Sequence, residues 1–66
     1  MQEHQQRVID EKAELDSKLE KLNTFINVSD TFNHLDSEDQ ELLEDQANCM
    51  AEYSAILRAR IARFRD

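Results

Sequence analysis

Residues 37–64 read SEDQELLEDQANCMAEYSAILRARIARF, and this stretch decides the fold. Ser37 and Gln40 have the S-x-x-Q spacing of a capping box, which marks the start of a helix. Apolar pairs then recur every seven residues: Leu42-Leu43, Cys49-Met50 and Ile56-Leu57. Such pairs are typical of a helix with a wide apolar stripe. We therefore predict a helix over about 37–65, with a stripe that one partner helix would not cover.

The first half of the chain carries a narrower apolar seam. Its members follow a 3,4 spacing: Met1, Val8, Leu15, Leu19, Leu22 and Ile26. Gln5 and Lys12 occupy two further positions of this seam. The spacing predicts a helix over about 3–27. Residues 28–36 then form the turn, in which 31–35 make one short helical turn that places Phe32 and Leu35 inward.

The composition excludes most other folds. The chain of 66 residues contains no Gly and no Pro, so it lacks the residues that tight β-turns and phosphate-binding loops require. We predict an all-α fold in a single domain, 1–66. Its two long helices would form an antiparallel helical hairpin, with the short helical turn between them.

The same pattern predicts self-association. A turn centred near residue 32 would place Leu22 opposite Leu43, Leu15 opposite Met50, and Val8 opposite Leu57. One helix pair buries too little apolar area to offset the entropy of ordering the chain. We expect a dimer or larger assembly, most simply a four-helix bundle of two hairpins. The predicted core and oligomer interface comprises Leu15, Leu19, Leu22, Leu43, Met50, Tyr53, Ile56, Leu57, Ile61 and Phe64.

Charge is distributed unevenly along the chain. The net charge is −7, from 15 acidic and eight basic side chains, which works against binding to nucleic acids or anionic membranes. Residues 28–52 contain eight acids and no base, whereas 53–66 contain four Arg and one Asp. No apolar run is long enough to span a membrane, and the start resembles no signal peptide. We expect a cytoplasmic protein, and the single Cys49 agrees with a reducing compartment.

Catalytic and metal-binding patterns are missing from the sequence. His4 and His34 are thirty residues apart, and the chain has no H-x-x-x-H or C-x-x-C motif. Cys49 lies on the apolar stripe, where we expect it to be a small core or interface residue rather than a catalytic nucleophile. We predict no catalytic residue, no metal site, no cofactor and no enzyme activity.

Two charged segments are candidate binding surfaces. The acidic surface comprises Glu38, Asp39, Glu41, Glu44 and Asp45. It could dock on a basic partner, or it could serve only solubility. The arginine cluster comprises Arg58, Arg60, Arg63 and Arg65. Guanidinium groups bind phosphates bidentately, so this cluster could hold an anion. Its alternative roles are to compensate the helix dipole or to pair with Glu3 or Asp66.

Several short motifs of the chain form a recognisable series: Arg7-Val8-x-x-Glu11-Lys12, Leu15-x-x-Lys18-Leu19-x-Lys21-Leu22-x-x-Phe25-Ile26, Phe32-x-x-Leu35, Leu42-Leu43-x-x-Gln46, Met50-x-x-Tyr53 and Ile56-Leu57-x-x-Arg60-Ile61. With these motifs the chain resembles small proteins of tailed phages and prophages, which are grouped with a crAss-like-phage family of uncharacterised helical proteins. The resemblance implies a helical hairpin that acts inside a bacterial host. It implies no activity and supplies no catalytic residues.

Three functional hypotheses follow. The first is a non-enzymatic phage accessory protein that oligomerises and binds a host or defence-system protein through its charged surface. The second is an oligomeric sponge that binds a phosphorylated nucleotide signal through its C-terminal arginines, in an anti-defence role. The third is a purely structural oligomerisation module. The sequence does not choose between the first two, because both use the same fold and the same charged residues.

Overall fold

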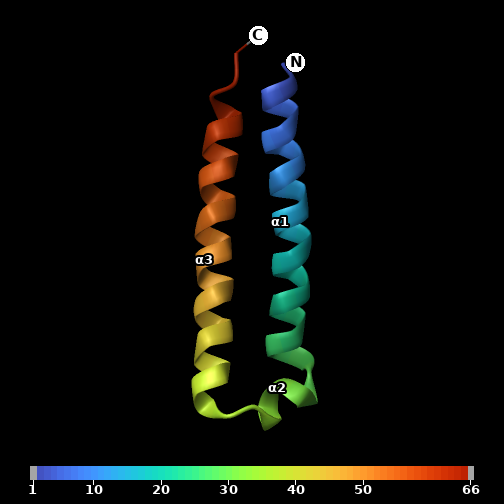
Figure 1. The fold of residues 1–66 in the computed structure, drawn as a ribbon, viewed down its shortest axis with the longest axis vertical. Helices are drawn as coiled ribbons and strands as arrows, with labels where there is room; N and C mark the ends of the chain where they lie inside the picture. The colour runs from blue at the N-terminus through green and yellow to red at the C-terminus, as the bar shows by residue number, and fades with distance from the viewer. Residues whose placement is uncertain (1, 66) are drawn as a thin grey trace.

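The computed structural model describes residues 2–65, and these residues form three helices. The long helices are α1 (Glu3–Val28) and α3 (Ser37–Ala62), and the short helix α2 (Asp30–His34) lies between them. The long helices lie side by side and run in opposite directions, with α2 at one end of the pair (Figure 1). The molecule is a rod of 49 × 15 × 13 Å. The predicted all-α class is confirmed.

The chain reverses direction without glycine by using three extended residues. Ser29 has φ −78° and ψ 129°; it ends α1, and its Oγ accepts a hydrogen bond from Thr31 N that starts α2. Leu35 and Asp36 are extended in the same way, with φ near −70°. No residue from 2 to 65 has a positive φ. Two short bends around one helical turn therefore replace the tight turn that glycine would allow.

Phe32 closes the turn end of the molecule. Its side chain is buried, and its ring meets Phe25 edge to face at a centroid distance of 6.0 Å. Gln40 Nε2 donates a hydrogen bond of 2.8 Å to Phe32 O. Contacts to both long helices therefore hold α2 in place.

The cap of α3 differs from the predicted capping box. The N-cap residue is Asp36, one residue before Ser37, and its Oδ1 accepts from Asp39 N at 2.9 Å. The Gln40 side chain instead bonds the turn, since its Nε2 donates to Phe32 O. Helix α3 ends at Ala62, before the predicted end at about 65, and Phe64 N bonds Ile61 O in a tightened last turn.

The predicted register between the long helices is wrong by about one turn. It would place Asp16 opposite Cys49, yet Asp16 bonds Ser54, five residues further on. The bond from Gln5 to Arg65 agrees with this shifted register. The cause is α2, which carries the chain past the end of α1 before α3 begins, so that α3 starts lower on the long axis (Figure 1).

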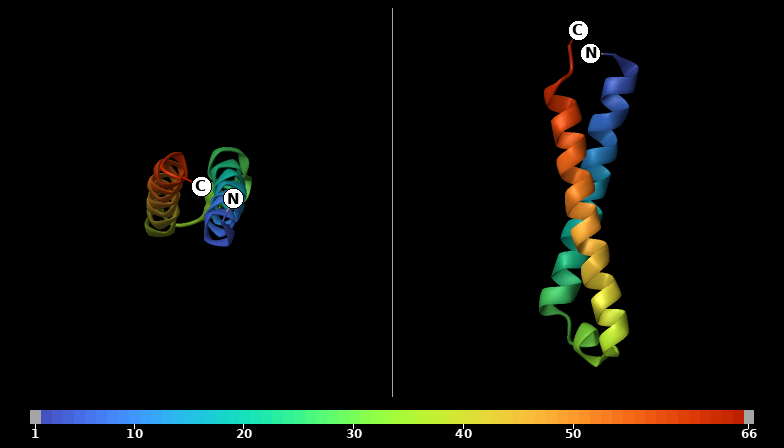
Figure 2. Two further views of the ribbon diagram at one scale, coloured as in Figure 1. Left: turned by 90° about the horizontal axis from the view of Figure 1, so that it is seen from above. Right: turned by 90° about the vertical axis from the view of Figure 1, so that its left-hand side faces the viewer.

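The core is a thin line between the two helices. Leu57 is completely buried, and Val8, Ala47 and Phe32 are the other buried apolar residues among those described. Most other seam residues are half-buried: Leu15, Leu19, Leu22, Leu43, Met50, Ile61 and Phe64. A view along the axis shows why, since each long helix has only one long neighbour (Figure 2).

Candidate binding surfaces

The acidic surface lies on the first turns of α3, beside α2. Its five carboxylates, Glu38, Asp39, Glu41, Glu44 and Asp45, are all exposed. None of them forms an ion pair with a base among residues 2–65, where the two ion pairs both lie inside α1. The placement near the positive end of the helix dipole favours these charges locally. Their free carboxylate oxygens leave the whole surface open to a partner.

The arginine cluster lies at the opposite end of α3. Arg58 and Arg60 belong to the last two turns, Arg63 is the C-cap residue, and Arg65 follows the helix. All four side chains are exposed, and none contacts a carboxylate within residues 2–65. Arg65 Nη1 donates to Phe64 O at 3.1 Å. The guanidinium groups are therefore available to an external anion.

The predicted pairing of this cluster with Glu3 is not found. Glu3 instead accepts a hydrogen bond of 2.7 Å from Arg7, four residues on in α1, with both side chains well exposed. Asp66, the other predicted partner, lies outside the described residues. Because Glu3 pairs with Arg7 of its own helix, its carboxylate does not compensate the positive charge of the arginines of α3.

Gln5 fixes the segment that carries the arginines. Its side chain is only 4% exposed, and both ends of its amide are hydrogen-bonded. Oε1 accepts from Gln2 N, and Nε2 donates to Arg65 O, each at 3.0 Å. The first turn of α1 thus holds the chain that follows α3, although 60 residues separate the two. This arrangement gives the arginine cluster a defined position before any ligand arrives.

A polar cluster crosses the helix interface near its middle. Lys12 Nζ donates to Asp16 Oδ2 at 2.6 Å, and Ser54 Oγ of α3 donates to Asp16 Oδ1. The hydrogen bonds from Lys12 and Ser54 lower the pKa of Asp16 below its ordinary value, against a smaller opposing effect of desolvation. These bonds select one register, because a shift by one turn would separate Ser54 from Asp16.

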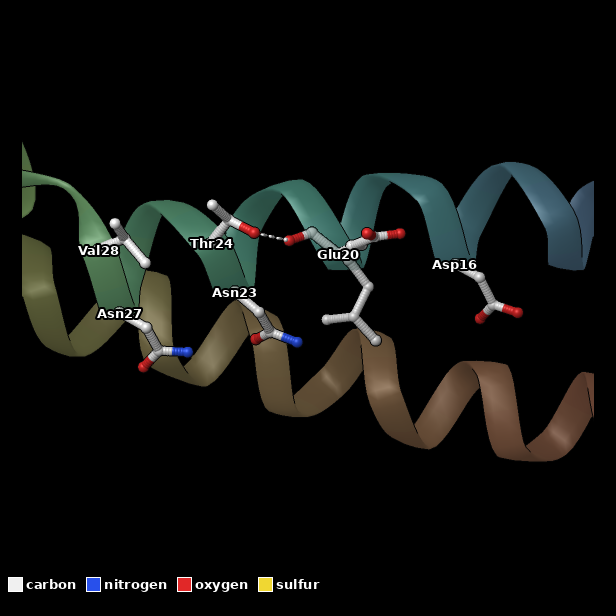
Figure 3. Close-up of a pocket in the computed structure, with 7 residues that line it drawn as sticks. Asp16, Glu20, Asn23, Thr24, Asn27 and Val28 are labelled. Carbon is white, nitrogen blue, oxygen red and sulfur yellow. Dashed lines mark hydrogen bonds between the residues drawn. The ribbon is translucent and has the colours of Figure 1, made fainter.

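An open groove runs along α1 between this polar cluster and the turn. Its volume is about 400 Å³, and it is lined by Asp16, Leu19, Glu20, Asn23, Thr24, Asn27 and Val28. Asn23, Asn27 and Asp16 point toward α3 in Figure 3, whereas the hydroxyl of Thr24 donates to Glu20 O at 2.9 Å. The lining combines two carboxylates with two amides and no base, so phosphate would be repelled here.

The predicted interface residues divide into two groups. Leu57 and its half-buried neighbours face α1, but Tyr53 and Ile56 are exposed. Gln46 and Cys49 are exposed as well, so the single chain leaves this part of the predicted stripe uncovered. The reason is geometric: α1 covers only one of the two apolar rows on α3.

The histidines lie far apart along the chain and do not form a site together. His4 is in the first turn of α1, and His34 ends α2, where its Nδ1 lies 2.7 Å from Asp30 O. Within residues 2–65, no three His, Cys, Asp or Glu side chains are placed to hold a metal ion. Across the same residues, neither long helix is apolar enough to cross a membrane.

Comparison with known proteins identifies one family. The family model described as Sequestin matches residues 2–63, which is nearly the whole chain. No curated protein and no solved structure shows significant similarity to the chain.

Proposed function

The chain belongs to the Sequestin family, and we propose that it is a non-enzymatic sequestering protein whose target is a phosphorylated nucleotide. The family name supports a binding role without turnover. The observation that favours a phosphorylated target is the arginine cluster, in which four exposed guanidinium groups within eight residues meet no carboxylate of residues 2–65. Exposed arginines at a fixed position suit the bidentate recognition of phosphate.

The setting of this role is also a proposal. The resemblance to small phage and prophage proteins supports action in the cytoplasm of a bacterial host. A sponge that removes a nucleotide signal of a defence system would need abundance and affinity, and it would need no catalytic residue. Self-association would multiply the binding sites on each particle.

Calorimetric titration with a panel of linear and cyclic nucleotides tests the proposal, with the matching nucleosides as phosphate-free controls. We expect at least one nucleotide to bind and its nucleoside to fail. Each arginine that contacts phosphate should, when changed to Ala, weaken binding about tenfold to a hundredfold. Lys21→Ala is the matched control, since it removes an exposed base from the half of α1 nearer the turn. Failure of every nucleotide to bind would refute the proposal.

A second candidate function uses the acidic surface. Five exposed and unpaired carboxylates within residues 37–45 could bind a basic host or defence-system protein. Neutralising all five as Gln or Asn should abolish capture of that protein from host lysate, whereas Glu11→Gln and Glu14→Gln on α1 should not. Capture that survives the five changes would exclude the acidic surface as the binding site.

A further inference from the structure

The face of α3 beside the buried seam carries exposed apolar residues. Leu42 is 59% exposed, Ile56 59% and Tyr53 42%. We propose that this exposed stripe docks on the same stripe of a second copy of the chain, with the two α3 helices antiparallel. The stripe comprises Leu42, Gln46, Cys49, Tyr53 and Ile56. The exposed stripe can pair in this way whether or not the chain binds a nucleotide.

The spacing of the stripe matches that of a helix interface. Leu42, Cys49 and Ile56 recur every seven residues, and Gln46 and Tyr53 follow the same period. The same 4,3 alternation describes the seam of α3 that faces α1, and each stripe residue directly precedes a seam residue in the sequence. The seam residues are Leu43, Ala47, Met50, Ser54 and Leu57. A helix with two adjacent seams contacts two neighbouring helices, as in a bundle. In the single chain α3 has only one such neighbour, α1 (Figure 2).

Charge complementarity identifies the second neighbour as another α3. Glu38 and Asp45 lie on the stripe face at one end, at positions three or four residues from Leu42. Arg60 and Arg63 continue the stripe at the other end, each seven residues beyond a stripe residue. An antiparallel second copy places the acidic end of each helix against the basic end of the other. A parallel copy would oppose like charges at both ends.

This dimer divides the arginine cluster into two pairs. Arg60 and Arg63 continue the stripe and would meet the carboxylates of the second copy. Arg58 lies outside the stripe, and Arg65 belongs to the segment that Gln5 holds against α1. Arg58 and Arg65 therefore remain available for a phosphate. On the proposed function, they are the arginines that contact the ligand.

The mass of the wild-type chain in solution provides the first test. Light scattering after size-exclusion chromatography should give twice the chain mass of 7.8 kDa, and Leu42→Glu and Ile56→Glu should each give the mass of one chain. Both side chains are exposed in the single chain, so the variants should keep their helical circular dichroism. Val28→Glu is the matched control, because Val28 is 75% exposed but lies on α1. The Val28→Glu variant should remain dimeric.

Charge reversal tests the orientation. In an antiparallel dimer, Glu38→Lys with Asp45→Lys should weaken self-association, as should Arg60→Glu with Arg63→Glu. Mixing the two double variants should restore dimers, since both ends regain opposite charges. A parallel dimer would be as strong with the first double variant as with the wild-type chain.

Several results would overturn the proposal. A wild-type chain that stays monomeric shows that no second copy covers the stripe, and a dimer that tolerates both stripe variants shows that another surface is used. Nucleotide binding is measured separately. A monomer that binds nucleotide refutes only the dimer, and a dimer that binds none refutes only the proposed function.

Discussion

Gln5 and Arg65 join the two ends of the molecule through one hydrogen bond. The buried amide of Gln5 donates from Nε2 to Arg65 O at 3.0 Å, while its Oε1 caps the start of α1. Gln5 thus occupies a position of the apolar seam of α1, and it bonds the backbone that follows α3. Its effect is to hold the end of α3, where the arginine cluster lies, against α1.

Gln5→Met should loosen this end. The change keeps the bulk of the side chain but removes both hydrogen bonds, at a cost of about 1 kcal/mol. We expect faster hydrogen exchange at the amides of Phe64 and Arg65, measured by NMR. Gln6→Met is the control, because the side chain of Gln6 is exposed and bonds Asp10 in its own helix. Unchanged exchange in Gln5→Met would show that the bond does not order the segment.

The Asp16 carboxylate should make stability depend on pH. Its pKa in the folded chain is lowered from the ordinary value of 3.8 by hydrogen bonds from Lys12 and Ser54. The stabilisation is therefore complete above 3.8 and is lost as the pH falls through 3.8 and then through the lower pKa of the folded state. Asp16→Asn should remove this part of the pH dependence in urea unfolding at acidic pH.

Ser54→Ala should raise the pKa of Asp16 toward 3.8, because it removes one of the two hydrogen bonds. An NMR titration of the Asp16 carboxyl carbon measures the change. Ser17→Ala, which removes an exposed hydroxyl from α1, should leave the value unaltered. Equal pKa values in Ser54→Ala and the wild-type chain would show that the bond across the helices does not form in solution.

Leu57→Ala should be among the most destabilising substitutions in the chain. Leu57 is the one fully buried large side chain of residues 2–65, and its truncation should cost about 2–4 kcal/mol of unfolding free energy. Val28→Ala should cost less than about 0.5 kcal/mol, since that side chain is mostly exposed. Urea unfolding at matched protein concentration compares the two. Similar costs would show that the core is not where the structure places it.

The cap of α3 can be tested by two adjacent substitutions. Asp36→Ala removes the oxygen that accepts from Asp39 N and should cost about 1 kcal/mol. Ser37→Ala should have little effect, because Asp36 is the N-cap residue. Thermal unfolding followed by circular dichroism distinguishes them. A larger loss for Ser37→Ala would restore the capping box that the sequence suggested.

The helices were predictable because their signals are local. The seven-residue repeat of Leu42, Cys49 and Ile56 needs no tertiary contact to be recognised, and neither does the lack of glycine. The exact cap was not predictable, since Asp36 and Ser37 are both good N-cap residues and a capping box at Ser37 also needs the Gln40 side chain to lie beside the start of the helix. Gln40 bonds Phe32 O, a partner that only the folded turn provides.

The register between α1 and α3 could not be predicted from the sequence for the same reason. It depends on the path of α2, which shifts α3 along the axis, and on the bond between Asp16 and Ser54. Neither residue belongs to the apolar pattern, so nothing marked them as partners across 38 residues. The charged surfaces were easier to predict, because the exposed arginines of 58–65 stay close together in sequence in any register.

The placement of the arginine cluster at the open end has a kinetic consequence. Contacts near α2 join residues close in sequence, whereas the bond between Gln5 and Arg65 closes a loop between residues 60 positions apart. The contacts between the long helices should therefore form first near the turn and open first at the opposite end, where the arginines lie. A phosphate bound by the arginines would stabilise the closed form of the end that opens first, so ligand binding should slow the local opening there.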